Sequence, residues 1–172
     1  VRIAANTDPK FTGNIQIVGI LYIESPNVVE FGGNCDITGI IVAAGDYTDN
    51  SGDNQLSFQG NVGSESVEAL PADARYDGLR DETGTFLMAP GFSVTFGGSF
   101  DTLNGCIVAN GVVFFGSAGG QIGGSILNYS DETIELSGGD LLFNRGEITE
   151  TPPGFIPDIE LQYDAASYEE VH

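Results

Sequence analysis

A chain of 172 residues fits one domain and is long enough to bury a core. Hydrophobic residues make up 41 % of it, which excludes a disordered acidic tail, and the net charge of −20 disfavours binding to nucleic acid or to anionic lipid. With 25 Gly and no Trp, the composition favours many short strands joined by tight corners.

The chain begins at Val1 and shows neither a signal peptide nor an apolar run of about 18 residues. We therefore expect an export signal or anchor to lie outside this sequence, and no direct membrane insertion by this segment. Cys35 and Cys106 both lie in apolar, strand-like runs. The simpler interpretation is that both are thiols buried in the core, and the alternative is that they form a single disulfide.

A short motif recurs along the chain: a large apolar residue, one further residue, Gly, and then often a small polar residue. Its clearest copies are Phe11-Thr12-Gly13-Asn14, Phe31-Gly32-Gly33-Asn34, Phe58-Gln59-Gly60-Asn61 and Phe96-Gly97-Gly98-Ser99. Weaker copies are Phe115-Gly116-Ser117 and Leu136-Ser137-Gly138. Each copy leads into an apolar run with alternating polarity, which indicates strands with one buried face.

The spacing of these copies predicts the architecture. The leading residues at 11 and 31 are 20 apart, and those at 96, 115 and 136 are separated by 19 and 21. A unit of about 20 residues suits one coil of a solenoid. We therefore predict an all-β fold, a parallel β-helix of about six coils spanning about residues 11–148 within a single domain 1–172. Parallel crossovers favour the right-handed form.

Two intervals are longer than one coil, and the excess falls in polar segments. We predict loop insertions at 46–54 and 65–86, with a degenerate seventh coil inside the second interval as the alternative. The Pro-rich segment 149–172 is expected either to cap the last coil or to link it to another element.

The first insertion contains oxygen-bearing side chains that suit Ca²⁺, namely Asp46, Asp49, Asn50, Asp53 and Asn54. Their spacing does not follow the EF-hand rule, and the same residue types dominate ordinary turns. Ca²⁺ is the only candidate cofactor.

The residues available for catalysis are few. The single histidine is His172, which removes His-based triads and His-rich metal sites, and no phosphate-binding loop is present. We expect no catalytic residues. The alternative is a carbohydrate-active enzyme with paired carboxylates, for which Asp36 and Asp101 are candidates because they hold comparable places in their coils. Tyr22, Tyr47 and Tyr76 are the candidate aromatics for the groove of such an enzyme.

The pattern Gly-Asn-x-x-Ile-x-Gly-Ile-Ile-Val at 33–42, followed near the end by Tyr163-Asp164-Ala165-Ala166, resembles a bacterial family. It is similar to the C-terminal β-helical domain of PilX-like pilus-assembly and surface proteins. The resemblance implies an outward-facing, non-catalytic module with other surface or pilus proteins as partners. This chain lacks the apolar N-terminal segment of that family.

A second similarity is to bactofilins, which are cytoskeletal β-helices that polymerise end to end. The long insertions and the Pro-rich tail depart from that pattern. We expect a secreted or cell-surface structural or adhesive module, with the carbohydrate-active enzyme and the end-to-end polymer as alternatives.

Overall fold

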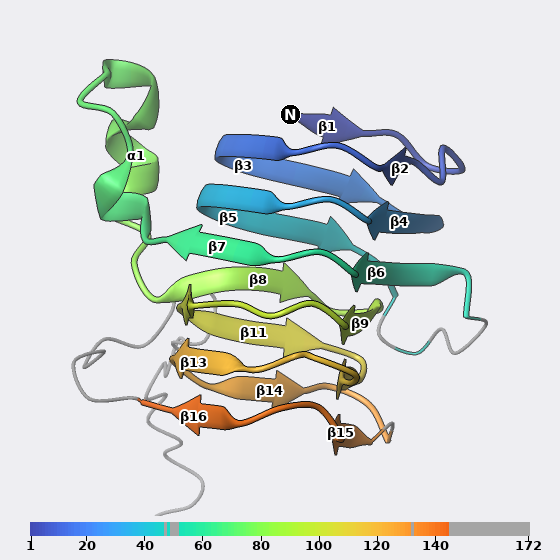
Figure 1. Ribbon diagram of the computed structural model, residues 1–172. Coiled ribbons are helices and arrows are strands. Elements are labelled where there is room, and N and C mark those ends of the chain that lie inside the picture. Colours follow the sequence, from blue (N-terminus) through green and yellow to red (C-terminus); the bar gives the residue numbers. More distant parts are fainter. Residues whose placement is uncertain (47, 49–51, 132, 145–172) are drawn as a thin grey trace, which may run out of the picture.

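The computed structural model describes residues 1–46, 48, 52–131 and 133–144, and they form a parallel β-helix (Figure 1). All strand pairs are parallel. The first sheet comprises β1 (Arg2–Ile3), β3 (Ile15–Glu24), β5 (Cys35–Ala44), β7 (Val62–Glu65), β8 (Thr85–Ala89), β11 (Cys106–Ala109) and β14 (Ile126–Asn128). The second comprises β2 (Lys10–Phe11), β4 (Asn27–Phe31), β6 (Asn54–Phe58), β9 (Ser93–Phe96), β12 (Val112–Phe114) and β15 (Ile134–Leu136). The third comprises β10 (Thr102–Asn104), β13 (Gly120–Gly123) and β16 (Leu141–Phe143).

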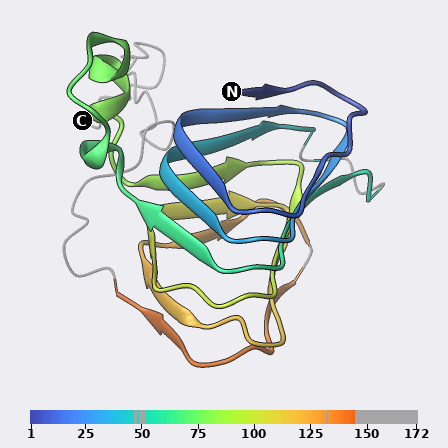
Figure 2. The ribbon, with the colours of Figure 1, turned by 45° about the horizontal axis from the view of Figure 1, so that its top comes forward.

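The six-stranded second sheet contains one strand from each coil, so the described chain makes six coils, as the repeat predicted. Figure 2 shows these coils stacked along a common axis, with the N-terminal coil at the top. Strand β5 serves two faces, because its first residues pair with β7 whereas Ile41 and Val42 pair with β8.

The bend within β3 and β5 falls on glycine. Gly19 and Gly39 stand opposite each other in the register and have φ angles of 100° and 136°. A Cβ on Gly39 would lie 2.0 Å from the carbonyl oxygen of Gly19. Only glycine combines this backbone conformation with so close an approach of the neighbouring coil.

The core is built from side chains that repeat at the same place in successive coils. Their most regular part is a ladder of five phenylalanines: Phe11, Phe31, Phe58, Phe96 and Phe114. Successive ring centroids lie 4.9–5.2 Å apart with interplanar angles of at most 16°. This spacing follows from the separation of parallel strands, which stack identical side chains directly on one another.

One residue of the predicted repeat is wrong. We placed Phe115 in the series of leading residues, but Phe114 is buried in the ladder and Phe115 is exposed. The tripeptide Phe114-Phe115-Gly116 keeps the spacing of Phe11-Thr12-Gly13, so Phe115 is the middle residue of the motif. The coil intervals, measured from Phe96 to Phe114 and from Phe114 to Leu136, are therefore 18 and 22 residues. The corners between the strands, rather than the strands themselves, absorb this difference in length.

Both long intervals contain insertions. Strand β6 pairs directly with β9 although 38 residues separate Phe58 from Phe96, so no seventh coil lies between them. The second insertion holds the 3₁₀ helices Val67–Ala69 and Ala74–Tyr76 and the helix α1 (Asp77–Arg80). The first lies between β5 and β6, and Asn54 belongs to β6 rather than to the loop.

The helical insertion packs outside the bend of the coils. Val67 and Leu70 form a small apolar cluster with Ile40, and Val42, Tyr76 and Leu79 pack against it. No helix in the described part of the chain is long and apolar enough to cross a membrane. The predicted cap or linker at 149–172 lies outside the described residues.

Candidate functional site

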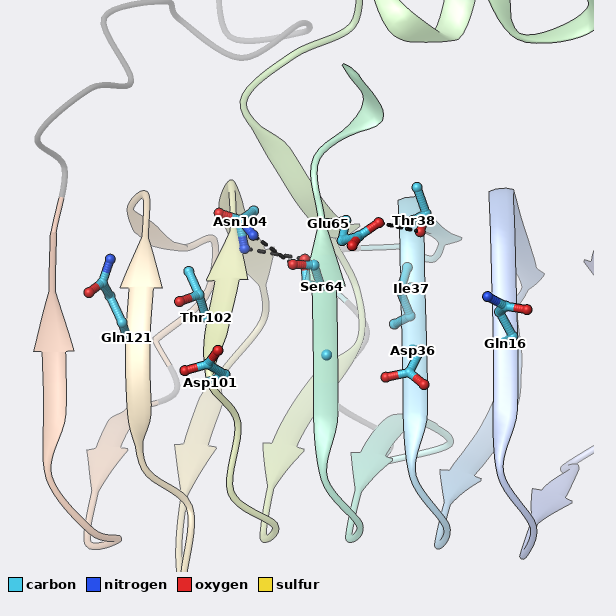
Figure 3. A pocket seen from close by; sticks show the side chains of 11 residues that line it. Gln16, Asp36, Ile37, Thr38, Ser64, Glu65, Asp101, Thr102, Asn104 and Gln121 are labelled. Carbon is cyan, nitrogen blue, oxygen red and sulfur yellow. Dashed lines mark hydrogen bonds between the residues drawn. The ribbon is translucent and has the colours of Figure 1, made fainter. Parts of the chain in front are cut away.

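An open polar groove runs across the outer face of β5, β7 and β10 (Figure 3). It has a volume of about 700 Å³. Its lining consists of Gln16, Asp36, Ile37, Thr38, Gly63, Ser64, Glu65, Asp101, Thr102, Asn104 and Gln121. A shallower hollow of about 450 Å³ adjoins it and shares Asp36, Gly63 and Asp101.

The parallel register brings Asp36 and Asp101 into one row. Asp36 pairs with Gly63, and the bridge between Val62 and Phe100 places Asp101 on the other side of Gly63. Asp36 lies on β5 and Asp101 lies directly before β10, so two inter-strand spacings, about 9–10 Å, separate their backbones. The sequence singled out both residues, and the structure brings them to the same groove.

Gly63 forms the floor between the two acids. A Cβ at this position would lie 2.7 Å from Oδ1 of Asp36, so the Asp36 side chain leans over the glycine. A side chain at residue 63 would displace the carboxylate and fill the groove.

Hydrogen bonds between coils hold one wall of the groove. Asn104 donates from its backbone N–H to Ser64 Oγ at 3.2 Å and from Nδ2 to the Ser64 carbonyl oxygen at 2.6 Å. Thr38 Oγ1 donates to Glu65 Oε2 at 3.1 Å. The motif search missed Ser64, Glu65, Asn104 and Gln121, because only an alignment of the coils shows that they share a face.

The chemistry of the groove is acidic and hydrogen-bonding. Three carboxylates line it, together with amides and hydroxyls, and the described lining residues include no Lys, Arg, His or aromatic side chain. It therefore repels anionic ligands and lacks both a stacking platform and a cationic electrophile.

The aromatic candidates lie elsewhere. Tyr22 faces outward on β3, and the Tyr76 ring lies 3.1 Å from the position that a Cβ on Gly19 would take. Tyr76 thus covers the bend of the coils, and the Arg75 guanidinium lies 5.1 Å from its ring centroid. Tyr47 lies outside the described residues.

The candidate Ca²⁺ residues have different structural roles. Asn54 is buried, and its Oδ1 accepts from the backbone N–H of Asn27 at 3.3 Å, so it belongs to a corner of the coils. Asp46 accepts from the Thr48 hydroxyl and N–H at 2.7 and 2.9 Å, and these bonds lower the pKa of its carboxyl group. Asp53 is in the described chain, whereas Asp49 and Asn50 lie outside it. Among the described residues, no group of three His, Cys, Asp or Glu side chains is arranged to hold a metal ion.

Both cysteines are buried thiols that form no disulfide, so the predicted core interpretation is confirmed and the disulfide alternative is wrong. Burial raises the pKa of the Cys35 thiol to about 12, with a smaller contribution from the Asp36 carboxylate beside it. Cys35 is therefore protonated at neutral pH and is a poor nucleophile.

Comparison with known proteins returned no counterpart: no protein-family model, curated protein or solved structure matches the chain significantly.

Proposed function

We propose that the chain is a non-catalytic structural or adhesive module of an exported bacterial cell-surface or pilus-related assembly. The observation that carries the proposal is the unbroken ladder from Phe11 to Phe114, which ties successive coils into one rod. Close-packed cores transmit strain and resist compression, so such a rod acts as a stiff spacer.

The groove supports a binding role over a catalytic one. Its lining lacks a histidine, lysine or arginine among the described residues, and the Cys35 thiol is protonated and buried. The helical insertion and the outer face of β5, β7 and β10 are the surfaces that would meet partners.

The proposal is tested in the producing bacterium. An antibody raised against the folded chain should label intact cells, and external protease should remove that label while an internal marker protein stays intact. A chain that only lysed cells reveal would contradict the proposal.

A carbohydrate-active enzyme remains the second candidate, because Asp36 and Asp101 flank Gly63 in one groove. Inverting glycosidases place their two carboxyl groups about 6.5–9.5 Å apart. Release of new reducing ends from a panel of neutral glycans, abolished by both Asp36→Asn and Asp101→Asn, would establish this activity and overturn the first proposal. Absence of release by the wild-type chain would remove the second candidate.

A further inference from the structure

The floor of the groove is a glycine at a place where the coils do not require one. Gly63 lies within β7, its φ angle is outside the left-handed region, and within 4 Å its Cβ would meet only the end of the Asp36 side chain. The corner glycines Gly33, Gly60 and Gly98 differ, because a Cβ on each would lie 2.0–2.1 Å from a backbone carbonyl oxygen of the neighbouring coil. A glycine inside a strand weakens it and often marks a site where a ligand approaches closely. Gly63 therefore keeps the outer face of the sheet open rather than closing a corner.

The carboxylates around this floor have no compensating charge within the described chain. Figure 3 shows Asp36 and Asp101 on either side of β7. Their side chains form no ion pair and no hydrogen bond with the described residues. The third carboxylate, Glu65, accepts a hydrogen bond from the neutral Thr38 hydroxyl. All three acids therefore present negative charge to whatever enters the groove.

The cationic side chains of the described chain are engaged elsewhere. Their ion pairs are Arg2–Glu24, Lys10–Glu30, Arg75–Asp73 and Arg80–Asp77. None of these residues lines the groove, and Arg145 lies outside the described residues. The field of the groove is therefore left for a group from outside the described chain to neutralise.

The lining fits a cationic side chain better than a neutral sugar or a bare metal ion. No aromatic side chain among the described lining residues offers a stacking platform, and no three described acids are arranged to hold a metal ion. The backbones of Asp36 and Asp101 are about 9–10 Å apart along the axis of the coils. An extended segment that follows this axis meets each of the two carboxylates with a different side chain.

We propose that the groove binds an extended, lysine- or arginine-bearing segment of a partner protein. The segment crosses Gly63, one of its cationic side chains bonds to Asp36 and another to Asp101. These are charge-assisted hydrogen bonds, which are the strong ones in such a contact. Thr102 and Gln121 side chains, which make no hydrogen bond within the described chain, bond to the backbone of the segment. The inference rests on the proposed assembly role and names the chemistry of the partner.

Fluorescence anisotropy of a labelled peptide tests the charge requirement. The probe has about eight residues with Lys at every second position, which puts its ammonium groups on one side of an extended chain. In about 0.15 M salt, Asp36→Asn combined with Asp101→Asn should weaken binding at least about tenfold. The control combines Glu82→Gln with Glu135→Gln, two exposed acids outside the groove. It removes the same charge and should weaken binding less than about twofold, because salt screens distant charges.

Gly63→Ala tests the open floor separately from the charge. The methyl group displaces the Asp36 carboxylate and fills the groove, so peptide binding should weaken at least about fivefold, whereas the thermal midpoint should not fall, since Ala is favoured over Gly inside a strand. Gly13→Ala is the control, because a Cβ at Gly13 has no heavy atom within 4 Å. It should leave peptide binding unchanged.

Equal weakening by the two pairs of acid variants would show that the peptide responds to net charge alone and would overturn the proposal. A wild-type chain that binds no peptide, or that binds the lysine-acetylated peptide equally well, also overturns it. Surface labelling of intact cells does not depend on the groove, so the assembly role stands or falls separately.

Discussion

At the scale of single residues, the fold depends on identical side chains stacked on identical side chains. Phe96 is the most heavily engaged, because it stacks on Phe58 and Phe114 and meets Phe100 edge-on with ring centroids 6.0 Å apart. It is fully buried. A ring with partners above, below and beside it leaves a large void when removed.

Phe96→Ala should lower the free energy of unfolding by about 3–5 kcal/mol, through lost apolar burial and the cavity left behind. Urea denaturation followed by circular dichroism measures the change. The control is Phe115→Ala, at the exposed neighbour of the ladder, which should cost less than about 1 kcal/mol. Equal losses in the two variants would contradict the role of the ladder.

Gly39→Ala should destabilise the chain by at least about 2 kcal/mol, because the new Cβ meets the Gly19 carbonyl and the backbone is in a left-handed conformation. Gly13→Ala is the matched variant, since a Cβ at Gly13 has no heavy atom within 4 Å. Thermal unfolding of the two variants compares them directly. A Gly39→Ala midpoint equal to that of Gly13→Ala would refute the steric argument.

The Cys35 thiol makes stability depend on alkaline pH. Its pKa is raised from 9.0 to about 12 in the folded chain, so between these values the folded state holds a proton that the unfolded state has released. The contribution is therefore fully present below pH 9 and is lost as pH rises toward 12. Wild type should lose stability relative to Cys35→Ala over that interval in urea titrations. Parallel curves for the two chains would show that the thiol is not responsible.

At the scale of elements, the helical insertion is attached by a small cluster of its own rather than by the main core. Leu70 is buried between the insertion and Ile40. The insertion also contains Arg75 and Arg80, two sites at which trypsin cuts. Local opening of this element can therefore be measured separately from global unfolding.

Leu70→Ala should accelerate tryptic cleavage after Arg75 and Arg80 while shifting global unfolding little, because the stacked coils do not depend on this cluster. Leu103→Ala, in the main core, should instead lower global stability by about 2–5 kcal/mol. Mass spectrometry of the fragments together with urea curves separates the two effects. Cleavage of the Leu70→Ala chain at the wild-type rate would contradict the attachment described above.

At the scale of the whole molecule, a net charge of −20 opposes compaction. The ion pairs that the described residues form, such as Lys10–Glu30 and Arg75–Asp73, are largely exposed and contribute little against this repulsion. We expect the thermal midpoint to rise between about 10 mM and about 0.5 M NaCl as the charges are screened. A midpoint that falls with salt would show that the exposed ion pairs dominate.

The sequence by itself determined the architecture. The recurrence of Phe, one residue and Gly at 11, 31, 58 and 96 identified the coil, and alternation identified the buried faces. These signals are local, because each strand must bury one face and each corner needs glycine. The placement of Phe115 was wrong because two adjacent phenylalanines satisfy the local pattern, and only stacking on Phe96 selects Phe114.

Tertiary structure alone decided which side chains share a surface. Asp36 and Asp101 are 65 positions apart in the sequence, and Glu65 and Asn104 belong to different coils, yet all four line one groove. The register between coils brings them together, and this register depends on how many residues each insertion removes from the stack. The sequence alone does not give the number of residues that the insertions take out of the coils, because that number is known only once the strands are paired. The groove and its glycine floor were therefore visible only in the folded molecule.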